Sequence, residues 1–200
     1  MIHIVIFTDS FDDHSVKFRR CDAASPATRR RRKPGSILFV RNTSPLLQER
    51  RISMEVADLH TIEGRRYPAR RRTQNLVGGV SPIQAKNFCM GFVTLDPDGG
   101  QVPWHNQEQE EIYFIVDGMG EMCLGSERRP LSTGQAVYIP SGVFHQLTNT
   151  GTTPMKMIYC YGPTGDVAHW RQELQGTLPR AGIDVPPLPE GACPQCTETF

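Results

Sequence analysis

The sequence predicts an all-β domain, an antiparallel barrel or sandwich, and three observations predict it. Short runs rich in β-branched and aromatic residues recur about every ten residues, and they cover 87–95, 111–116, 121–124, 135–139, 143–149 and 154–161. Segments of Gly, Pro and Asp that are typical of tight turns separate these runs. Long helical patterns do not alternate with the runs, as they would in a parallel α/β sheet.

Residues 1–53 precede this pattern as a basic leader. They hold 11 Lys/Arg against 5 Asp/Glu, whereas residues 54–200 hold 11 against 16. The run RRRRK at 29–33 could serve nucleic-acid binding or nuclear import, but a solvated, disordered arm is the simpler interpretation. Another hypothesis is that the leader is not part of the native protein, because the composition from Met54 onward matches the domain that follows.

The remainder of the chain is expected to be one domain with a tail. Residues 54–178 would form the barrel, beginning with one or two edge strands near 75–80. The Pro-rich residues 179–200 would run extended on the surface.

A helix is expected near 166–175, where GDVAHWRQELQG has a helical composition between two glycines. Asp166 is placed to cap its start, and we interpret His169 as part of the helix packing. The residues whose spacing puts them on one face of the helix are Val167, Trp170 and Leu174.

Composition limits the classes of protein to which this chain can belong. Its net charge of +1 and pI near 7.7 indicate no highly charged partner for the chain as a whole. Six cysteines in a long chain without a secretory leader predict reduced thiols and a cytoplasmic location, and no stretch approaches the roughly 18 apolar residues of a membrane span. Cys193 and Cys196 would suit a zinc knuckle or a redox pair, but no second CxxC pair accompanies them.

Four polar residues in two separate segments are candidate metal ligands. His105, Gln107 and Glu111 share one parity, so they face the same interior if no bulge intervenes. In the second segment, His145 follows a turn at 140–142 and lies inside a predicted strand. Two well-separated hairpins that each project an imidazole or a carboxylate inward can close a mononuclear metal site.

The two segments together resemble the cupin family. Its first motif is Gly-x5-His-x-His-x(3 or 4)-Glu-x6-Gly. The corresponding positions here are Gly99, His105, Gln107, Glu111 and Gly118, with three residues before the glutamate. Its second motif, Gly-x5-Pro-x-Gly-x2-His-x3-Asn, is matched by Gly134, Pro140, Gly142, His145 and Asn149. The resemblance implies a small jelly-roll β-barrel with a metal inside, held by the residues at the four ligand positions.

One position departs from the family pattern, because Gln107 stands where the second histidine is expected. The ligand set would then be two nitrogens and two oxygens, one of them anionic, which suits one divalent ion of Fe, Mn, Zn, Ni or Co. The other role open to Gln107 is to support the ligands without binding the metal. A His, Gln, Glu, His set also occurs in cupins that isomerise sugar phosphates with zinc, so the departure does not imply loss of the metal.

The resemblance and the ligand set predict a metal-dependent enzyme, of dioxygenase, isomerase or lyase type, that acts on a small oxygenated organic substrate. Glu111 would balance charge and move protons as the catalytic residue. The alternative is a non-catalytic cupin module that binds a small ligand or has a regulatory role. Nucleic acid is a disfavoured partner, because its binding would require a native, ordered leader.

The alternation of side chains also predicts the substrate pocket. Tyr113 shares the face of Glu111, and in the last strand the residues that alternate with Lys156 face inward. The predicted pocket residues are Met90, Tyr113, Met157, Tyr159 and Tyr161. The outer face would carry Ile112, Phe114 and Val116, which are apolar enough to need covering by the leader, another layer or a second copy in a homodimer.

Overall fold

The structure is a computed structural model, and it describes residues 53–196. The predictions for the leader fall on residues 1–52, outside this range. The elements follow one another as β1 (Arg65–Tyr67), β2 (Arg71–Val77), β3 (Cys89–Leu95), β4 (Gln101–His105), β5 (Glu110–Asp117), β6 (Met119–Leu124), β7 (Glu127–Ser132), β8 (Ala136–Ile139), β9 (His145–Asn149), β10 (Met155–Gly162) and α1 (Ala168–Leu174).

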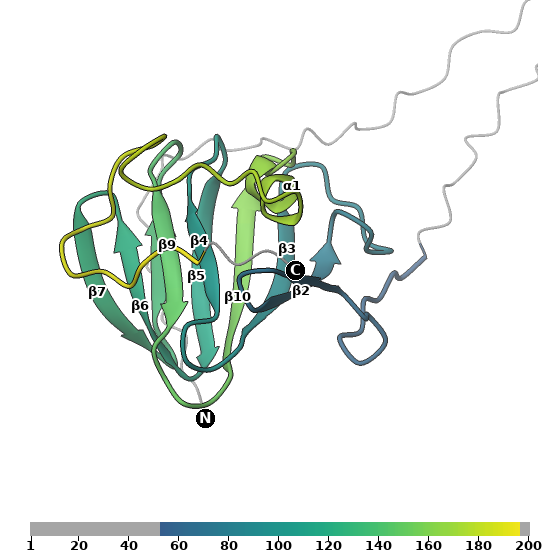
Figure 1. The fold of residues 1–200 in the computed structure, drawn as a ribbon. Coiled ribbons are helices and arrows are strands. Elements are labelled where there is room, and N and C mark those ends of the chain that lie inside the picture. Colours follow the sequence, from purple (N-terminus) through teal and green to yellow (C-terminus); the bar gives the residue numbers. More distant parts are fainter. Residues whose placement is uncertain (1–52, 197–200) are drawn as a thin grey trace, which may run out of the picture. The chain divides into compact units, whose positions relative to one another are not determined.

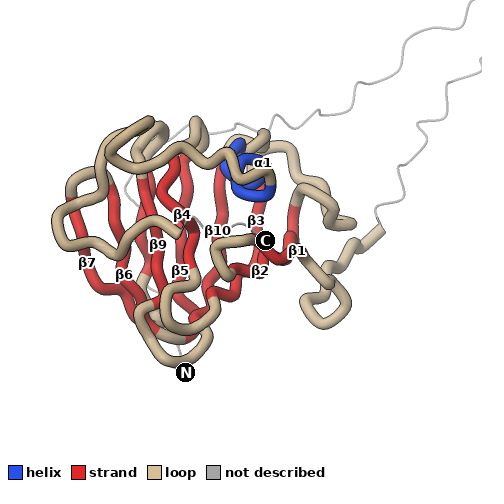
Figure 2. Tube along the Cα trace, viewed as in Figure 1, coloured by secondary structure: helices blue, strands red, loops and turns tan. Residues whose placement is uncertain are grey.

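The strands form two antiparallel sheets, as Figures 1 and 2 show. One sheet has the order β1-β2-β3-β10-β5-β8, and the other has the order β4-β9-β6-β7. A single cluster of buried apolar side chains draws on both sheets, with Tyr113 and Ile115 from the first and Met122 and Leu147 from the second. The predicted all-β barrel with a short C-terminal helix is confirmed.

The two edges of the four-stranded sheet carry features that discourage further strand pairing. β4 and β7 lie at these edges, and each contains a proline, Pro103 and Pro130 respectively. A proline removes a backbone donor and is tolerated at a sheet edge. β7 is mostly exposed and charged, which explains why no apolar alternation marks it in the sequence.

The C-terminal tail covers the outer face of the four-stranded sheet. It crosses the strands as the yellow segment in Figure 1. The Gln146 amide donates to the carbonyl of Cys193 at 2.8 Å, Gln101 donates to that of Pro194 at 2.8 Å, and the Trp104 indole donates to that of Pro186 at 2.9 Å. This cover explains why every residue of β4 and β9 is buried, on both faces of the sheet.

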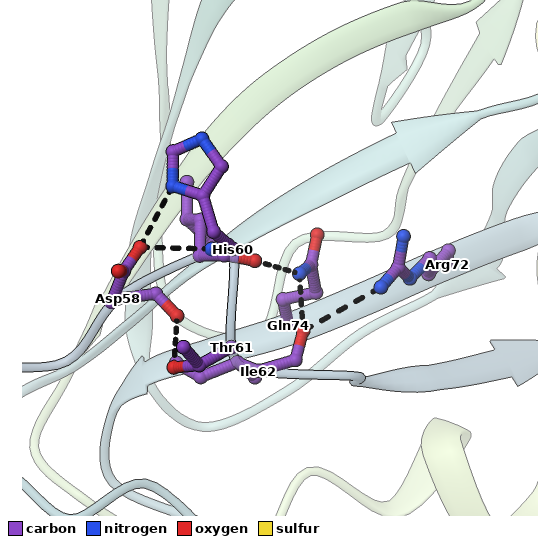
Figure 3. Close-up of polar contacts among 7 residues, drawn as sticks. Asp58, His60, Thr61, Ile62, Arg72 and Gln74 are labelled. Carbon is purple, nitrogen blue, oxygen red and sulfur yellow. Dashed lines mark hydrogen bonds and ion pairs between the residues drawn. The ribbon is translucent and has the colours of Figure 1, made fainter.

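A segment before β1 is fixed along β2 in a similar way. Figure 3 shows the Gln74 amide reaching the backbone carbonyls of this segment. Its distance to the Leu59 carbonyl is 2.9 Å, and the Arg72 guanidinium donates to the Glu63 carbonyl at 2.8 Å. Asp58 closes the turn by accepting from the His60 amide at 2.9 Å. Glutamine side chains thus attach irregular segments to both sheets.

The outer face of the six-stranded sheet is apolar and open among the described residues. Ile112, Phe114 and Val116 are 47%, 41% and 37% exposed, as the alternation predicted. Their covering by a second copy stays a prediction. Among the residues that the structure describes, no helix is long and apolar enough to span a membrane.

β3 presents a different face from the one predicted. Cys89, Gly91, Val93 and Leu95 are its buried residues. Met90 is paired with Cys160 on the other side, so the prediction that Met90 lines the pocket is wrong. Both faces of this strand are apolar in sequence, and alternation alone therefore could not tell the inner face from the outer one.

Position 91, on the inner face of β3, requires glycine because Tyr159 leaves no room for a side chain there. A Cβ at this position would lie 2.6 Å from the Tyr159 ring and 2.7 Å from the carbonyl oxygen of Gln74. We expect Gly91→Ala to lower the free energy of unfolding by about 1–3 kcal/mol, measured by urea denaturation. Gly151→Ala is the matched control, since its nearest new contacts are ordinary at 3.4 Å. Equal stability of the two variants would contradict this packing.

α1 buries only part of the face that was predicted, since Val167 and Trp170 pack on the core cluster but Leu174 does not. Its buried residues are His169 and Glu173, one turn apart, whereas Leu174 is 40% exposed. The helix begins without a side-chain cap, and Asp166 instead pairs with Arg171. The predictions of a capping Asp166 and an inward Leu174 are therefore wrong. Polar partners inside the barrel, described below, decide which face turns inward.

Candidate metal centre

Three potential ligands converge from three strands of the two sheets. His105 ends β4 and His145 begins β9, and the two residues are paired in register. Glu111 comes from β5 in the opposing sheet, and its carboxylate lies 3.5 Å from Nε2 of His145. One ligand atom from each residue lies within 4.8 Å of the others, and all three residues are buried. This separation would let a single ion bind all three.

The two histidines are oriented for metal binding by their own backbone. Nδ1 of His105 lies 2.7 Å from the carbonyl oxygen of Pro103, and Nδ1 of His145 lies 2.9 Å from that of Val143. A carbonyl can only accept, so the proton is assigned to Nδ1 and the lone pair to Nε2. Both Nε2 atoms are buried without a hydrogen-bond partner. Two buried imidazole acceptors without donors fit a cation between them.

Gln107 lies beside the group, in the turn between β4 and β5. Its Nε2 donates to Glu111 at 3.1 Å, and its Oε1 is buried without a partner. The backbone of this turn is held by the 140–142 turn, because the Gly142 amide donates to the Gln107 carbonyl at 2.7 Å. Gly142 has φ of +75°, which a residue with a side chain rarely adopts. The second turn therefore positions the first.

The candidate ligands converge across the barrel, and not through the alternation of side chains along one strand that the sequence analysis assumed. A turn separates His105 from Glu111, and the two residues belong to different sheets. The register of β4 also shifts between Val102 and His105. Alternation therefore does not run through the motif, and the fold brings its two halves together across the barrel.

Three residues that the sequence analysis did not assign to the site lie against it. The His169 ring lies against the His105 ring, with centroids 3.6 Å apart and planes tilted by 38°. Nε2 of His169 lies 3.5 Å from Nη1 of Arg71. Nη2 of Arg71 donates to Glu173, whose other oxygen accepts from the Ala69 amide at 3.0 Å. The spacing of His169 and Glu173 by four residues was the only sequence signal for this face of the helix.

Burial is the main cause of the shifted pKa values in the site. It holds the pKa of His105 well below its usual range, with a further contribution from His145. Burial and the nearby His105 likewise lower the pKa of His169. Burial and the charge of Glu111 raise the pKa of Tyr113 well above its usual value. His105 and His169 are therefore neutral at pH 7, and the Tyr113 phenol is protonated.

The remaining predicted pocket residues lie on the inner face. Tyr113, Met157, Tyr159 and Tyr161 are all buried, and the two latter rings are stacked with centroids 5.8 Å apart. Trp170 of α1 packs edge-on against both of these rings. The helix thus covers these two tyrosine rings.

Asn149 of the second motif has a structural role. It is 1% exposed, and its amide nitrogen reaches the carbonyl oxygens of Leu95, Asp96 and Thr153 at 2.9–3.1 Å. Its own oxygen accepts from the Gly151 amide at 2.9 Å. Asn149 therefore holds together loops at the end of β9 opposite His145, the candidate ligand.

A comparison with protein-family models supplies the deciding observation. The model of the cupin domain matches residues 91–161, the stretch that contributes His105, Glu111 and His145. Residues 91–161 form a cupin domain. Within this cupin, Gln107 stands at the position of the second motif histidine, and α1 lies beyond the matched range.

Similar proteins share the cupin region over part of the chain. An uncharacterized protein of Methanocaldococcus jannaschii is 35% identical over 45% of this chain and 61% of its own length. A polyketide synthase, CurC, of Streptomyces cyaneus is 27% identical over 54% of this chain and 69% of its own. A solved cupin barrel protein from Salinispora arenicola is 24% identical, with a TM-score of 0.46, over 62% of this chain and 98% of that one. The chain spans about six tenths of the first curated relatives it matches.

Proposed function

We propose that this cupin is a metal-dependent enzyme that holds one divalent ion and acts on a small oxygenated organic molecule. The observation that carries the proposal is the pair of buried Nε2 atoms of His105 and His145 without partners, facing the carboxylate of Glu111. Backbone carbonyls fix both rings in the tautomer that a metal requires. One curated relative is named a polyketide synthase, and polyketides are oxygenated organic compounds.

In this proposal the ligands are His105, Glu111 and His145, with Gln107 as the fourth. The unpaired Oε1 of Gln107 supports its assignment, since a neutral amide oxygen is a suitable ligand for Fe, Mn, Zn, Ni or Co. The bound ion would act as a Lewis acid on a substrate oxygen, and iron would also allow chemistry with dioxygen. Reactions of dioxygenase, isomerase and lyase type are all within the reach of such a site.

The other residues would bind substrate and exclude water. Tyr113 is held protonated by its buried setting, so it can donate a hydrogen bond to a substrate oxygen. Tyr159 and Tyr161 supply flat apolar surface, and Trp170 shields them from solvent. Glu111, as the only carboxylate of the ligand group, would balance the charge of the ion and carry protons.

Elemental analysis of the purified protein tests the proposal. We expect about one metal ion per chain in the wild type and at least a tenfold lower content in His145→Ala, since this variant loses one of the two imidazole ligands. His60→Ala is the matched control, because the His60 side chain is 94% exposed. Circular dichroism would show that both variants are folded. Equal metal content in His145→Ala and the control would refute the site.

A further inference from the structure

A small space lies between α1 and the candidate metal ligands, and its lining mixes polar and apolar side chains. Its lining includes Arg71, Thr73, Glu111, Tyr159, His169 and Trp170, and its volume is about 10 Å³. A cavity of this size holds about one water molecule. A substrate can therefore enter only if part of the lining moves, and two of these residues belong to α1.

Three buried polar atoms around this space have no partner. They are Nε of Arg71, Oγ1 of Thr73 and Nδ1 of His169, in residues that are 2%, 4% and 4% exposed. Leaving a buried donor or acceptor unpaired destabilises the folded protein. Three such atoms lining one space indicate a polar ligand that would pair with them.

The charge at this position is fixed by Arg71. A guanidinium is always protonated and presents a fork of donors that matches a carboxylate. Among the described residues, its one ion-pair partner is the carboxylate of Glu173 on α1. The Arg71 guanidinium also lies over the Tyr67 ring, with Cζ 4.2 Å from the centroid. If α1 moves away with Glu173, the buried cation requires another anion in its place.

The attachment of α1 makes such an exchange feasible. The helix has seven residues and no side-chain cap, so it is too short to be stable by itself. Its anchors on the barrel are Glu173 on Arg71 and the Ala69 amide, Trp170 on the tyrosines, and His169 on His105. His169 and Trp170 line the small space beside Arg71. Glu173 and Ala69 line another pocket, and a ligand that pairs with Arg71 would compete with Glu173 for the guanidinium.

We propose that this space is the binding site of a small organic anion, whose carboxylate pairs with Arg71 and displaces Glu173 as α1 opens. The site is charge-balanced in both states, by Glu173 when closed and by the ligand when open. The proposal deepens the proposed function, because the other end of the anion would face the metal ligands. It assigns the substrate class as a carboxylate and α1 as the lid.

The anion site is tested by calorimetric titration with malonate and with its neutral analogue malonamide. Glu173→Gln removes the competing carboxylate and keeps the side-chain size, so it should bind malonate about tenfold more tightly than the wild type. In Arg71→Gln/Glu173→Gln, malonate affinity should fall about tenfold to a hundredfold below that of Glu173→Gln, as expected for loss of a charged hydrogen-bonded pair. Malonamide should bind weakly to every variant. Equal malonate affinity in the two variants, or no binding to Glu173→Gln, would overturn the proposal.

The titrations are carried out on metal-free and on metal-loaded protein, with the metal content of each sample measured. A dependence on Arg71 that persists without metal supports the anion site whether or not an ion binds. Metal binding without any dependence on Arg71 would leave the proposed function standing and refute the anion site.

The role of α1 as the lid has a separate readout. The chain has two tryptophans, Trp170 on the helix and Trp104 under the tail. Malonate should change the fluorescence of Glu173→Gln. The change should persist when Trp104→Phe is added and disappear when Trp170→Phe is added. Persistence in the Trp170→Phe background would contradict movement of the helix.

Discussion

Replacing Arg71 alone with methionine is expected to lower the free energy of unfolding by about 3–5 kcal/mol, the usual cost of breaking a buried ion pair. The side chains of Arg71 and Glu173 are 2% and 1% exposed. Without the guanidinium, the Glu173 carboxylate keeps only the Ala69 amide as a donor. Urea denaturation at pH 7 measures the loss.

A double variant separates the effect of charge from that of packing. In Arg71→Met/Glu173→Met no buried charge remains, and apolar replacements of buried pairs are often neutral or stabilising. The double variant should therefore recover most of the stability that Arg71→Met loses. A double variant as unstable as the single one would indicate that the loss comes from the shape of the side chains.

The stability of Arg71→Met should also depend on pH in a defined direction. Burial raises the pKa of Glu173 above its usual 4.5, and Arg71 opposes this rise. Removing Arg71 therefore raises the pKa further. A carboxyl with a raised pKa in the folded state favours folding when protonated, and this stability is lost as pH rises through the folded-state pKa. The deficit of the variant should be small near pH 4.5 and grow toward pH 7.

The convergence of His105, Glu111 and His145 could be predicted from sequence, because fixed spacings to turn residues carry the resemblance to the cupin motifs. The turn at 140–142 fixes where His145 begins its strand, and the same turn binds the backbone of Gln107. In β10 the inner face could be predicted because Lys156 must reach water, and Met155, Met157 and Tyr159 alternate with it. A charged residue thus marks the orientation of a strand.

The residues under α1 could not be predicted, because their partners lie far away in sequence. Arg71 contacts His169 and Glu173 across 98 and 102 residues. A charged residue in a polar stretch normally indicates exposure, and only the assembled fold supplies the opposite charge that permits burial. The prediction that Met90 lines the pocket was wrong for a related reason, since β3 has no charged residue to mark its outer face. Close packing of Gly91 against Tyr159 decides the face instead.

A divalent ion is expected to stabilise the folded protein strongly, because its ligands come from three strands in two sheets. At a free metal concentration about a thousandfold above Kd, linkage predicts an increase of about 4 kcal/mol in the free energy of unfolding. Excess EDTA should reverse it. Urea denaturation of metal-loaded and metal-free protein measures this difference.

Glu111→Gln should change the two forms in opposite directions. Glu111 is 6% exposed, and without metal its buried charge has only the Gln107 amide as a donor partner in the structure. Removing that charge should leave the metal-free protein unchanged or more stable by about 1 kcal/mol. The metal-loaded protein should lose most of its added stability, because the anionic ligand is gone. Glu108→Gln, at an exposed position of the same turn, should behave as the wild type does. An equal gain on metal addition in Glu111→Gln would show that the ion does not use this carboxylate.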